Sequence, residues 1–241
     1  MRRAGALLAL LPACAAPPRE PASGPVLLYA QDFAEPQALE SFEFTDRAAW
    51  RWSDAGGLPS LELHAQSRYQ PPYRSPLSVA LLPCPPLAEY VLEVEALQTG
   101  PEYGHRDLIL VFGWSSPSRF CYAHLGAQPD ANSHNLFVVA DAPRRAVTPV
   151  GTRTLAWGQE QWHRLRLQCL RGSEIRVWFD GELLFQAAGM PAAGRIGLGS
   201  FDDTGRFRAI RVWSVPQSET KPDARASSAA GSARPEISAT R

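Results

Sequence analysis

Lysine is almost absent from this chain: Lys221 is the only lysine among 24 basic residues, and the rest are arginines. Net charge is absent as well, because 24 acidic residues balance the basic ones. Proteins that bind nucleic acid usually carry a basic stripe or patch that contacts the phosphates. The sequence shows no such stripe, so we expect no nucleic-acid partner.

The motifs of several common chemistries are also missing. The chain has no G-x-S-x-G nucleophile elbow, no phosphate-cradling glycine loop, no nucleotide fingerprint and no metalloprotease helix. Neither a CxxC pair nor a Cys/His spacing suggests zinc. What is present is 241 residues with 45% hydrophobic and 10% aromatic content, which suits one domain with a sizeable core.

Long hydrophobic runs are lacking, and the N-terminal run over residues 4–13 is too short to span a bilayer. It follows Arg2 and Arg3 and ends in "LPAC", which resembles the bacterial lipobox. We predict a signal peptide over residues 1–14 and lipidation at Cys14. The protein would then be an exported cell-envelope lipoprotein, periplasmic or on the outer surface, that meets the membrane only through its lipid. An ordinary signal peptide with an incidental cysteine, giving a secreted protein, is the alternative.

Three further cysteines remain, at positions 84, 121 and 169, and three cannot all pair. Cys121 and Cys169 lie among apolar neighbours, which favours buried free thiols, although one disulfide is open to an exported protein. Residues 15–25 are rich in proline and alanine and are expected to form a linker. Residues 217–241 have almost no large apolar side chains and are expected to be disordered. The folded domain is therefore placed at residues 26–216.

Short runs with period-two alternation fill this domain, and glycine, proline and aspartate clusters separate them. The run over residues 107–114 is apolar on both faces, which is typical of a central strand that is covered on both sides. Asp180 and Gly181 stand between two such runs and predict a hairpin turn. We expect ten to twelve antiparallel strands in an all-β sandwich of jelly-roll type, with no long helix.

Four segments in the second half carry a resemblance to a known superfamily: "QWHRLRLQ", "IRVWFDGELL", "GRIGLGSFDD" and "FRAIRVW". They resemble the concanavalin A-like lectin/glucanase superfamily over roughly residues 26–215. Within it, "YGHRDLILVFGW", "CYAHLG", "HNLFVVADAPR" and "GLGSFDDTG" are most similar to the bacterial 3-keto-disaccharide hydrolase-like group and to exported planctomycete-type sandwich proteins. The resemblance implies an antiparallel sandwich that contacts carbohydrate. Relatives often carry an Asp pair in the last strand, where this chain has Arg208 and Ala209.

Polar residues cluster at the start of the predicted central strand. Alternation places Tyr122 and His124 on one face of the run 119–125, and Cys121, Ala123 and Leu125 on the core face. Sugar sites need aromatic planes and planar polar groups, and the neighbouring strands supply both. The candidate ligand-binding residues are Tyr103, His105, Arg106, Tyr122, His124, His134, Asn135 and Arg144. Of His105 and Arg106, alternation lets only His105 share a face with Asp107. A surface ion pair beside a structural histidine is the alternative.

Three other chemistries have candidate residues in the sequence. Polysaccharide lyases of this shape use Tyr or His with Arg and Asn, but the spacing of the known lyase motifs is missing. Glu93 and Glu95 share a strand face, and a solvated outer face explains them better than a glycosidase pair. Asp202 and Asp203, together with Asp32, could hold a structural Ca²⁺ ion, while a simple turn is the competing explanation.

These observations predict an exported, monomeric, carbohydrate-binding β-sandwich module whose partner is a glycan or polysaccharide. Two alternatives stay open. One is a glycoside hydrolase of the 3-keto-disaccharide hydrolase type, and the other is a polysaccharide lyase or a non-catalytic structural envelope lipoprotein. A pair of carboxylates in the same groove would favour hydrolysis.

Overall fold

In the computed structural model of the protein, residues 24–215 are the ones described here. The predicted signal peptide, Cys14, most of the linker and the tail lie outside these residues and stay predictions. Within residues 24–215, no helix is long and apolar enough to cross a membrane. The helical content there is limited to three short 3-10 turns: η1 (Pro36–Ser41), η2 (Arg47–Ala49) and η3 (Ala55–Gly57).

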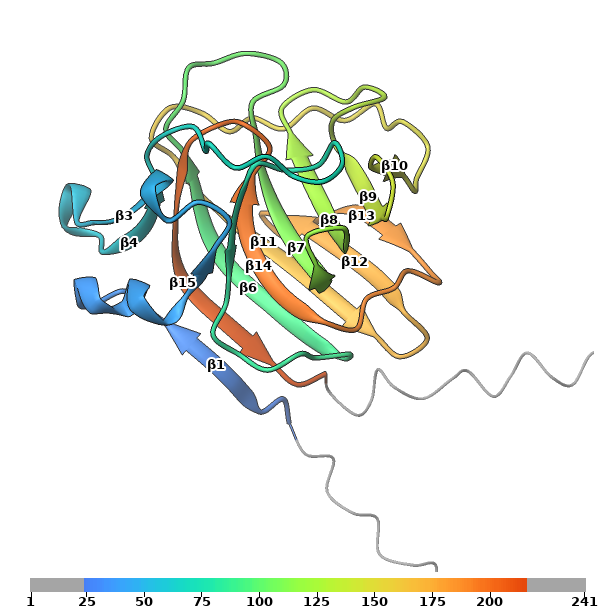
Figure 1. Cartoon of the computed structure of the whole chain (residues 1–241), viewed down its shortest axis with the longest axis horizontal. Helices are drawn as coiled ribbons and strands as arrows, with labels where there is room; N and C mark the ends of the chain where they lie inside the picture. The colour runs from blue at the N-terminus through green and yellow to red at the C-terminus, as the bar shows by residue number, and fades with distance from the viewer. Residues whose placement is uncertain (1–23, 216–241) are drawn as a thin grey trace, which may run out of the picture.

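Two antiparallel sheets pack face to face, as the strand pattern predicted (Figure 1). The eight-stranded sheet has the order β13-β12-β11-β6-β15-β4-β3, with β1 also paired to β15. Its strands are β1 (Leu27–Gln31), β3 (Trp50–Ser53), β4 (Ser60–Leu63), β6 (Tyr90–Gln98), β11 (Trp162–Leu170), β12 (Glu174–Phe179), β13 (Glu182–Ala187) and β15 (Gly205–Trp213).

The seven-stranded sheet has the order β10-β9-β8-β7-β14-β5-β2. Its strands are β2 (Glu43–Phe44), β5 (Ser78–Leu81), β7 (Asp107–Ser116), β8 (Arg119–Gly126), β9 (Asn135–Ala140), β10 (Arg145–Ala146) and β14 (Arg195–Ser200). The described residues thus contain more strands than the ten to twelve expected. The difference comes from β2, β3, β5 and β10, which are two to four residues long and too short to show a periodicity.

Strand β7 shows why its sequence is apolar throughout. Leu108, Leu110 and Phe112 enter the main core between the two sheets. Ile109 and Val111 face the other way, into a second apolar cluster on the outer side of the seven-stranded sheet. Both faces of this strand are therefore buried, as predicted for a central strand.

The predicted hairpin and the predicted free thiols are both found. Asp180 and Gly181 have φ angles of 49° and 84°, the left-handed values that a two-residue hairpin turn requires, and they join β12 to β13. Cys84, Cys121 and Cys169 are all free. Burial raises the pKa of the Cys121 and Cys169 thiols to about 12, so these two side chains behave as small apolar groups.

The two ends of the described chain meet at one end of the sandwich, where Leu27 of β1 pairs with Trp213 of β15. The other end is marked by Gly205 at the start of β15, which pairs with Gln98 at the end of β6. The loops after β6, β8 and β14 gather there, at the top of Figure 1. The candidate site lies among these loops.

Candidate functional site

A pocket of about 280 Å³ lies where β7 begins and its neighbours β8 and β14 end. We call it the strand-end pocket, and it is lined by Arg74, Tyr103, His105, Asp107, His124, Asn132, Arg144, Phe201 and Asp202. These residues come from five separate loops and two strands. They meet because β8 and β14 flank β7, so the loop before β7 and the loops that follow β8 and β14 share one edge of the sheet.

The pocket brings together four of the predicted ligand-binding residues: Tyr103, His105, His124 and Arg144. Tyr122 lies beneath them, fully buried, with its hydroxyl oxygen 2.9 Å from Nη1 of Arg144. The predicted alternation along β8 is confirmed, because Cys121 and Leu125 belong to the main core and Tyr122 to the outer cluster.

The guanidinium of Arg144 contacts side chains and backbone from several of the segments that form the pocket. Its Nη1 donates to the Tyr122 hydroxyl at 2.9 Å and to Nδ1 of His124 at 3.2 Å. Its Nη2 donates to the Asn132 carbonyl at 2.6 Å. The guanidinium plane lies between the Phe137 and Phe201 rings, 4.6 and 4.2 Å from their centroids. These contacts hold the side chain in one orientation before any ligand binds.

The contact with Arg144 determines the tautomer and the charge of the His124 imidazole. An arginine can only donate, so Nδ1 of His124 must be the acceptor, and the proton of the neutral ring sits on Nε2. That nitrogen lies 3.3 Å from Oδ2 of Asp107. Burial, followed by the charge of Arg144, lowers the pKa of His124 well below its usual value. His124 is therefore a neutral part of the pocket floor.

A carboxylate network forms the rest of the floor. The Asp107 oxygens accept from the Ser200 hydroxyl and from the Phe201 amide, both at 3.0 Å. Oδ2 of Asp203 accepts from the Tyr103 hydroxyl and the Asp107 amide, both at 2.8 Å. Burial raises the pKa of Asp107 well above its usual value, and the charge of Asp203 adds to this. This network explains why "YGHRD" begins a core strand: its polar groups tie the strand to the loop after β14.

Of the three aspartates predicted to hold a metal ion, Asp32 does not lie with the other two. Asp202 and Asp203 do lie together, but their third neighbour is Asp107, and one oxygen of each lies within 4.8 Å of the others. Asp32 lies elsewhere and pairs with Arg211 at 2.7 Å, because β1 meets β15 at that edge. Three carboxylates could offer oxygen ligands to a cation such as Ca²⁺. Both oxygens of Asp107, however, already accept hydrogen bonds.

Three predicted residues lie outside the pocket. Arg106 does not share a pocket with His105 and Asp107, as the alternation predicted, and instead is buried and lines a separate hollow. Asn135 fixes the loop after β10: its Oδ1 accepts from the amide and hydroxyl of Thr148, and its Nδ2 donates to the Thr148 carbonyl. His134 is buried, with Nδ1 3.0 Å from the Gly126 carbonyl and its ring edge-on to Phe185.

The buried imidazole of His134 predicts a pH dependence of stability. Burial lowers its pKa, and the charge of Arg153 adds to this, so the folded protein keeps the ring neutral below the usual histidine range. The unfolded chain then binds a proton that the folded chain does not, and stability falls as the pH drops below about 6.5.

We expect the wild type to lose stability relative to a His134→Asn variant between pH 7 and 5, with a slope of at most about 1.4 kcal/mol per pH unit. Asparagine tolerates the positive φ of 54° at this position and can donate to Gly126 in the same way. Urea unfolding at several pH values measures the difference. Two parallel stability curves would contradict the expectation.

Sequence reasoning missed three residues of the pocket: Arg74, Asn132 and Phe201. Phe201 directly precedes the Asp pair that was noticed, so the loop was found but not its aromatic member. Arg74 comes from the long loop between β4 and β5, and its carbonyl accepts the Arg144 amide at 3.1 Å. No local sequence pattern marks Arg74 or Phe201, because the contacts that bring them into the pocket join segments far apart in the sequence.

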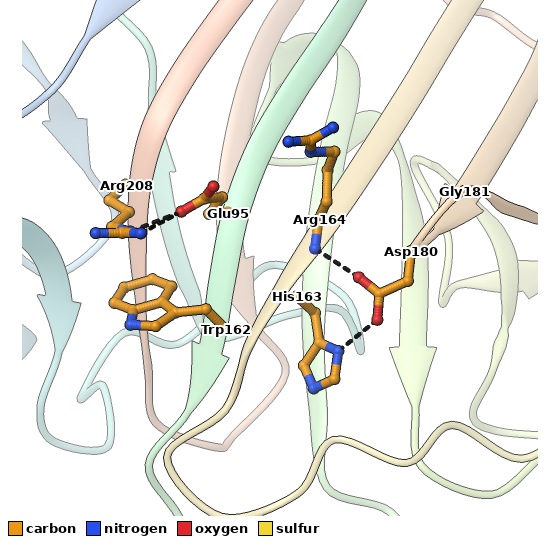
Figure 2. A pocket seen from close by; sticks show the side chains of 7 residues that line it. All are labelled: Glu95, Trp162, His163, Arg164, Asp180, Gly181 and Arg208. Atoms are coloured by element: carbon orange, nitrogen blue, oxygen red, sulfur yellow. Dashed lines mark hydrogen bonds and ion pairs between the residues drawn. The ribbon is translucent and has the colours of Figure 1, made fainter.

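A second hollow, of about 450 Å³, lies on the outer face of the eight-stranded sheet (Figure 2). It is lined by Glu95, Trp162, His163, Arg164, Asp180, Gly181 and Arg208, and we call it the outer-face hollow. Two pairs of its side chains are in contact: Arg208 with Glu95 at 2.7 Å, and Nδ1 of His163 with Oδ2 of Asp180 at 2.7 Å. Glu93 likewise faces Arg166 at 3.8 Å. Glu93 and Glu95 thus form the paired, partly solvated face that was favoured over a glycosidase pair.

The fold places this protein among the all-β antiparallel sandwiches of concanavalin A-like, jelly-roll type. No protein-family model matches the chain, and no curated protein is similar to it in sequence. Solved structures are similar at the level of the fold. A protein of unknown function with a galectin-like fold from Bacillus subtilis has a TM-score of 0.56 at 12% identity, covering 79% of this chain and 97% of that one.

Two further structures have a TM-score of 0.53. The carbohydrate binding module CBM66 from Bacillus subtilis is 14% identical, covering 72% of this chain and 96% of its own. A GlcNAcα1-4Gal releasing endo-β-galactosidase from Clostridium perfringens is 12% identical, covering 85% of this chain and 66% of its own. The expected antiparallel β-sandwich fold is confirmed, whereas the resemblance to 3-keto-disaccharide hydrolases stays a prediction.

Proposed function

We propose that this protein is a carbohydrate-binding module and that its glycan occupies the strand-end pocket. The observation that carries the proposal is the Phe201–Arg144 pair. Arg144 lies 4.2 Å and Arg74 6.0 Å from the centroid of the Phe201 ring, so an aromatic ring and planar polar groups, the types that sugar sites use, meet in this pocket. Around them, Asn132, His105 and Arg74 are exposed and supply planar donors and acceptors for hydroxyl groups.

Binding without turnover is better supported than hydrolysis. Asp107 and Asp202 do line the same pocket, which is the pairing that would favour a glycoside hydrolase. A general acid must, however, reach the glycosidic oxygen. Asp107 is 0% exposed and holds two protein hydrogen bonds, so only Asp202 is accessible to a sugar.

A lyase mechanism has less support still. It needs a tyrosine or histidine that can take a proton from the substrate. Tyr122 is buried under Arg144, and Nδ1 of His124 already accepts a hydrogen bond from the same guanidinium. Neither of these two side chains has a free basic atom that faces the pocket opening, and the exposed candidate, His105, already has its Nε2 3.1 Å from Oδ2 of Asp130.

The export and lipid anchor predicted from residues 1–14 are compatible with this function. The described chain starts at the end of the sandwich opposite the strand-end pocket. A lipid on Cys14 would then leave the pocket facing away from the membrane, and membrane fractionation of a Cys14→Ser variant checks the anchor.

The glycan proposal is tested with an array of immobilised neutral and acidic glycans and the full chain. We expect at least one glycan to bind and Phe201→Ala to weaken it about tenfold or more, because the stacking plane is removed. Trp162→Ala is the matched control, since it removes an aromatic side chain that lines the outer-face hollow. Absence of binding to every glycan, or equal loss in both variants, would sink the proposal.

A further inference from the structure

The exposed ring of Tyr103 separates the strand-end pocket from another hollow. This third hollow has a volume of about 400 Å³, and Tyr103 lines both. It opens at the end of the sandwich, with Trp157 as an apolar wall and Arg106, Gln128 and Glu102 as polar members. We call it the sandwich-mouth hollow. The side chain of Tyr103 is held in place by its hydrogen bond to Asp203, and the residue stays 44% exposed.

Arg106 is the unusual group in this hollow. It is only 2% exposed, and its surroundings do not satisfy it. Its Nη1 lies 3.6 Å from the carboxylate of Glu102, and its Nη2 is 3.4 Å from the Gln98 carbonyl, both long contacts. Its Nε has no hydrogen-bond partner among the described residues. A buried guanidinium normally holds close, charge-assisted hydrogen bonds, because desolvating the charge is costly.

The side chain of Gln98 also lacks hydrogen-bond partners. Its side chain belongs to the fully buried end of β6, beside Arg106, and neither its Nε2 nor its Oε1 has a partner within residues 24–215. Glu102 does not complete the set, because its side chain is 63% exposed and makes only the 3.6 Å contact. The hollow is therefore lined by a buried guanidinium edge that has no close hydrogen-bond partner and no close counter-ion among the described residues.

A carboxylate is the group that this edge fits. The guanidinium fork matches a carboxylate through two parallel hydrogen bonds, and the low exposure of Arg106 strengthens them. A sugar ring that carries such a group could occupy this hollow while its neighbour in the glycan chain occupies the strand-end pocket. The ring of Tyr103 would lie between the two sugars.

We propose that the sandwich-mouth hollow is a second subsite of the same glycan site and that it selects a uronic-acid residue through Arg106. This inference rests on the proposed function, since it extends the strand-end pocket to an oligosaccharide. It assigns the ligand as an acidic glycan with at least two residues across Tyr103.

The test uses oligogalacturonate, alginate and glucuronate-containing oligosaccharides, each beside its carboxyl-reduced, neutral counterpart. We expect the wild-type chain to bind at least one acidic member about tenfold or more tightly than its reduced form. Arg106→Gln should remove this preference and keep the affinity for the neutral form.

A surface variant keeps the test valid where Arg106→Gln fails to fold. Glu102→Gln removes the carboxylate that competes for Arg106, so it should strengthen binding of the acidic form a few-fold and leave the reduced form unchanged. Glu89→Gln is the matched control, because it makes the same change of charge on an exposed residue before the opposite end of β6.

The outcomes separate the two proposals. Equal affinity for the acidic and reduced forms, with binding still lost in Phe201→Ala, would overturn the uronate subsite and leave the glycan pocket standing. If no oligosaccharide of either form bound although a glycan of the array did, only the uronate subsite would fall, whereas absence of binding in both experiments would overturn both proposals. An equal response to Glu102→Gln and Glu89→Gln would also overturn the subsite, because it would show only a long-range charge effect.

Discussion

Replacing Arg144 with alanine is expected to abolish glycan binding and to lower the free energy of unfolding by about 2–5 kcal/mol. The loss of stability arises because Tyr122 and His124 are buried and would each lose the partner that Arg144 provides. Each stranded buried polar group costs about 1–3 kcal/mol. The loss of binding arises because Phe201 and Asn132 would no longer be held around the pocket.

Two variants separate these effects. Arg119→Ala removes an arginine of β8 whose ion pair with Asp141 is exposed, and it should change stability by less than about 0.5 kcal/mol. Arg144→Lys keeps the charge but has no planar fork, so it cannot serve Tyr122, His124 and Asn132 together and should also fail to bind. Urea unfolding gives the stability, and calorimetry on folded protein gives the affinity. Unchanged binding in Arg144→Ala would restrict this residue to a structural role.

Replacing Trp157 with alanine is expected to cost about 3–5 kcal/mol of stability, which corresponds to a melting temperature lower by roughly 10 °C or more. Its indole is 1% exposed, and Nε1 donates to the Leu125 carbonyl at 3.0 Å. The ring also packs edge-on against His163 and Phe179, at 5.5 and 5.0 Å. Trp157 thereby fixes the long segment between β10 and β11 to the core.

The control is again Trp162→Ala. Trp162 is partly exposed and contacts Arg208, so its loss should cost clearly less than that of Trp157. Trp157→Phe should fall between them, because it keeps most of the packing and loses the indole hydrogen bond. Thermal unfolding of the three variants gives the order. A Trp157→Ala cost below about 1 kcal/mol would show that the segment over residues 149–161 is not part of the cooperative core.

The predicted effects share a structural origin, namely that stability and recognition use the same side chains at this end of the sandwich. Arg144 joins the outer apolar cluster to the strand-end pocket, and Trp157 joins the main core to the sandwich-mouth hollow. Pockets supported in this way are preorganised, because their side chains are fixed by the fold before a ligand arrives. Variants that affect binding must therefore be compared at matched stability.

Much of the fold could be predicted from the sequence, because the signal is local. The two-sided apolarity of residues 107–114 predicted a central strand, and the Asp180-Gly181 pair predicted a hairpin. The alternation of Tyr122 and His124 against Cys121 and Leu125 predicted which side chains face the outer cluster and which face the core. Strands β2 and β10 were missed, since two residues carry no periodicity.

The candidate site could be predicted only in part. Tyr103, His105, His124 and Arg144 were found because they lie at or near the ends of three consecutive strands that pair in order. His134 was assigned to the same groove, but its φ of 54° breaks the alternation and turns the ring inward. Asp32 was grouped with the Asp202–Asp203 pair, whereas the pairing of β1 with β15 carries it to Arg211.

Local sequence patterns were enough to predict the class of fold, the face of each long strand and the polar start of the strand at "YGHRD", because alternation and turn chemistry act between residues close in the chain. The folded arrangement was needed to show that Asp107 joins Asp203, that Phe201 stacks on Arg144, and that Arg106 lines a separate hollow that Tyr103 also borders. These contacts join segments about 60 to 100 residues apart, or follow from which loops the sheet order brings together. No local pattern encodes them, because they depend on which strands become neighbours once the core is buried.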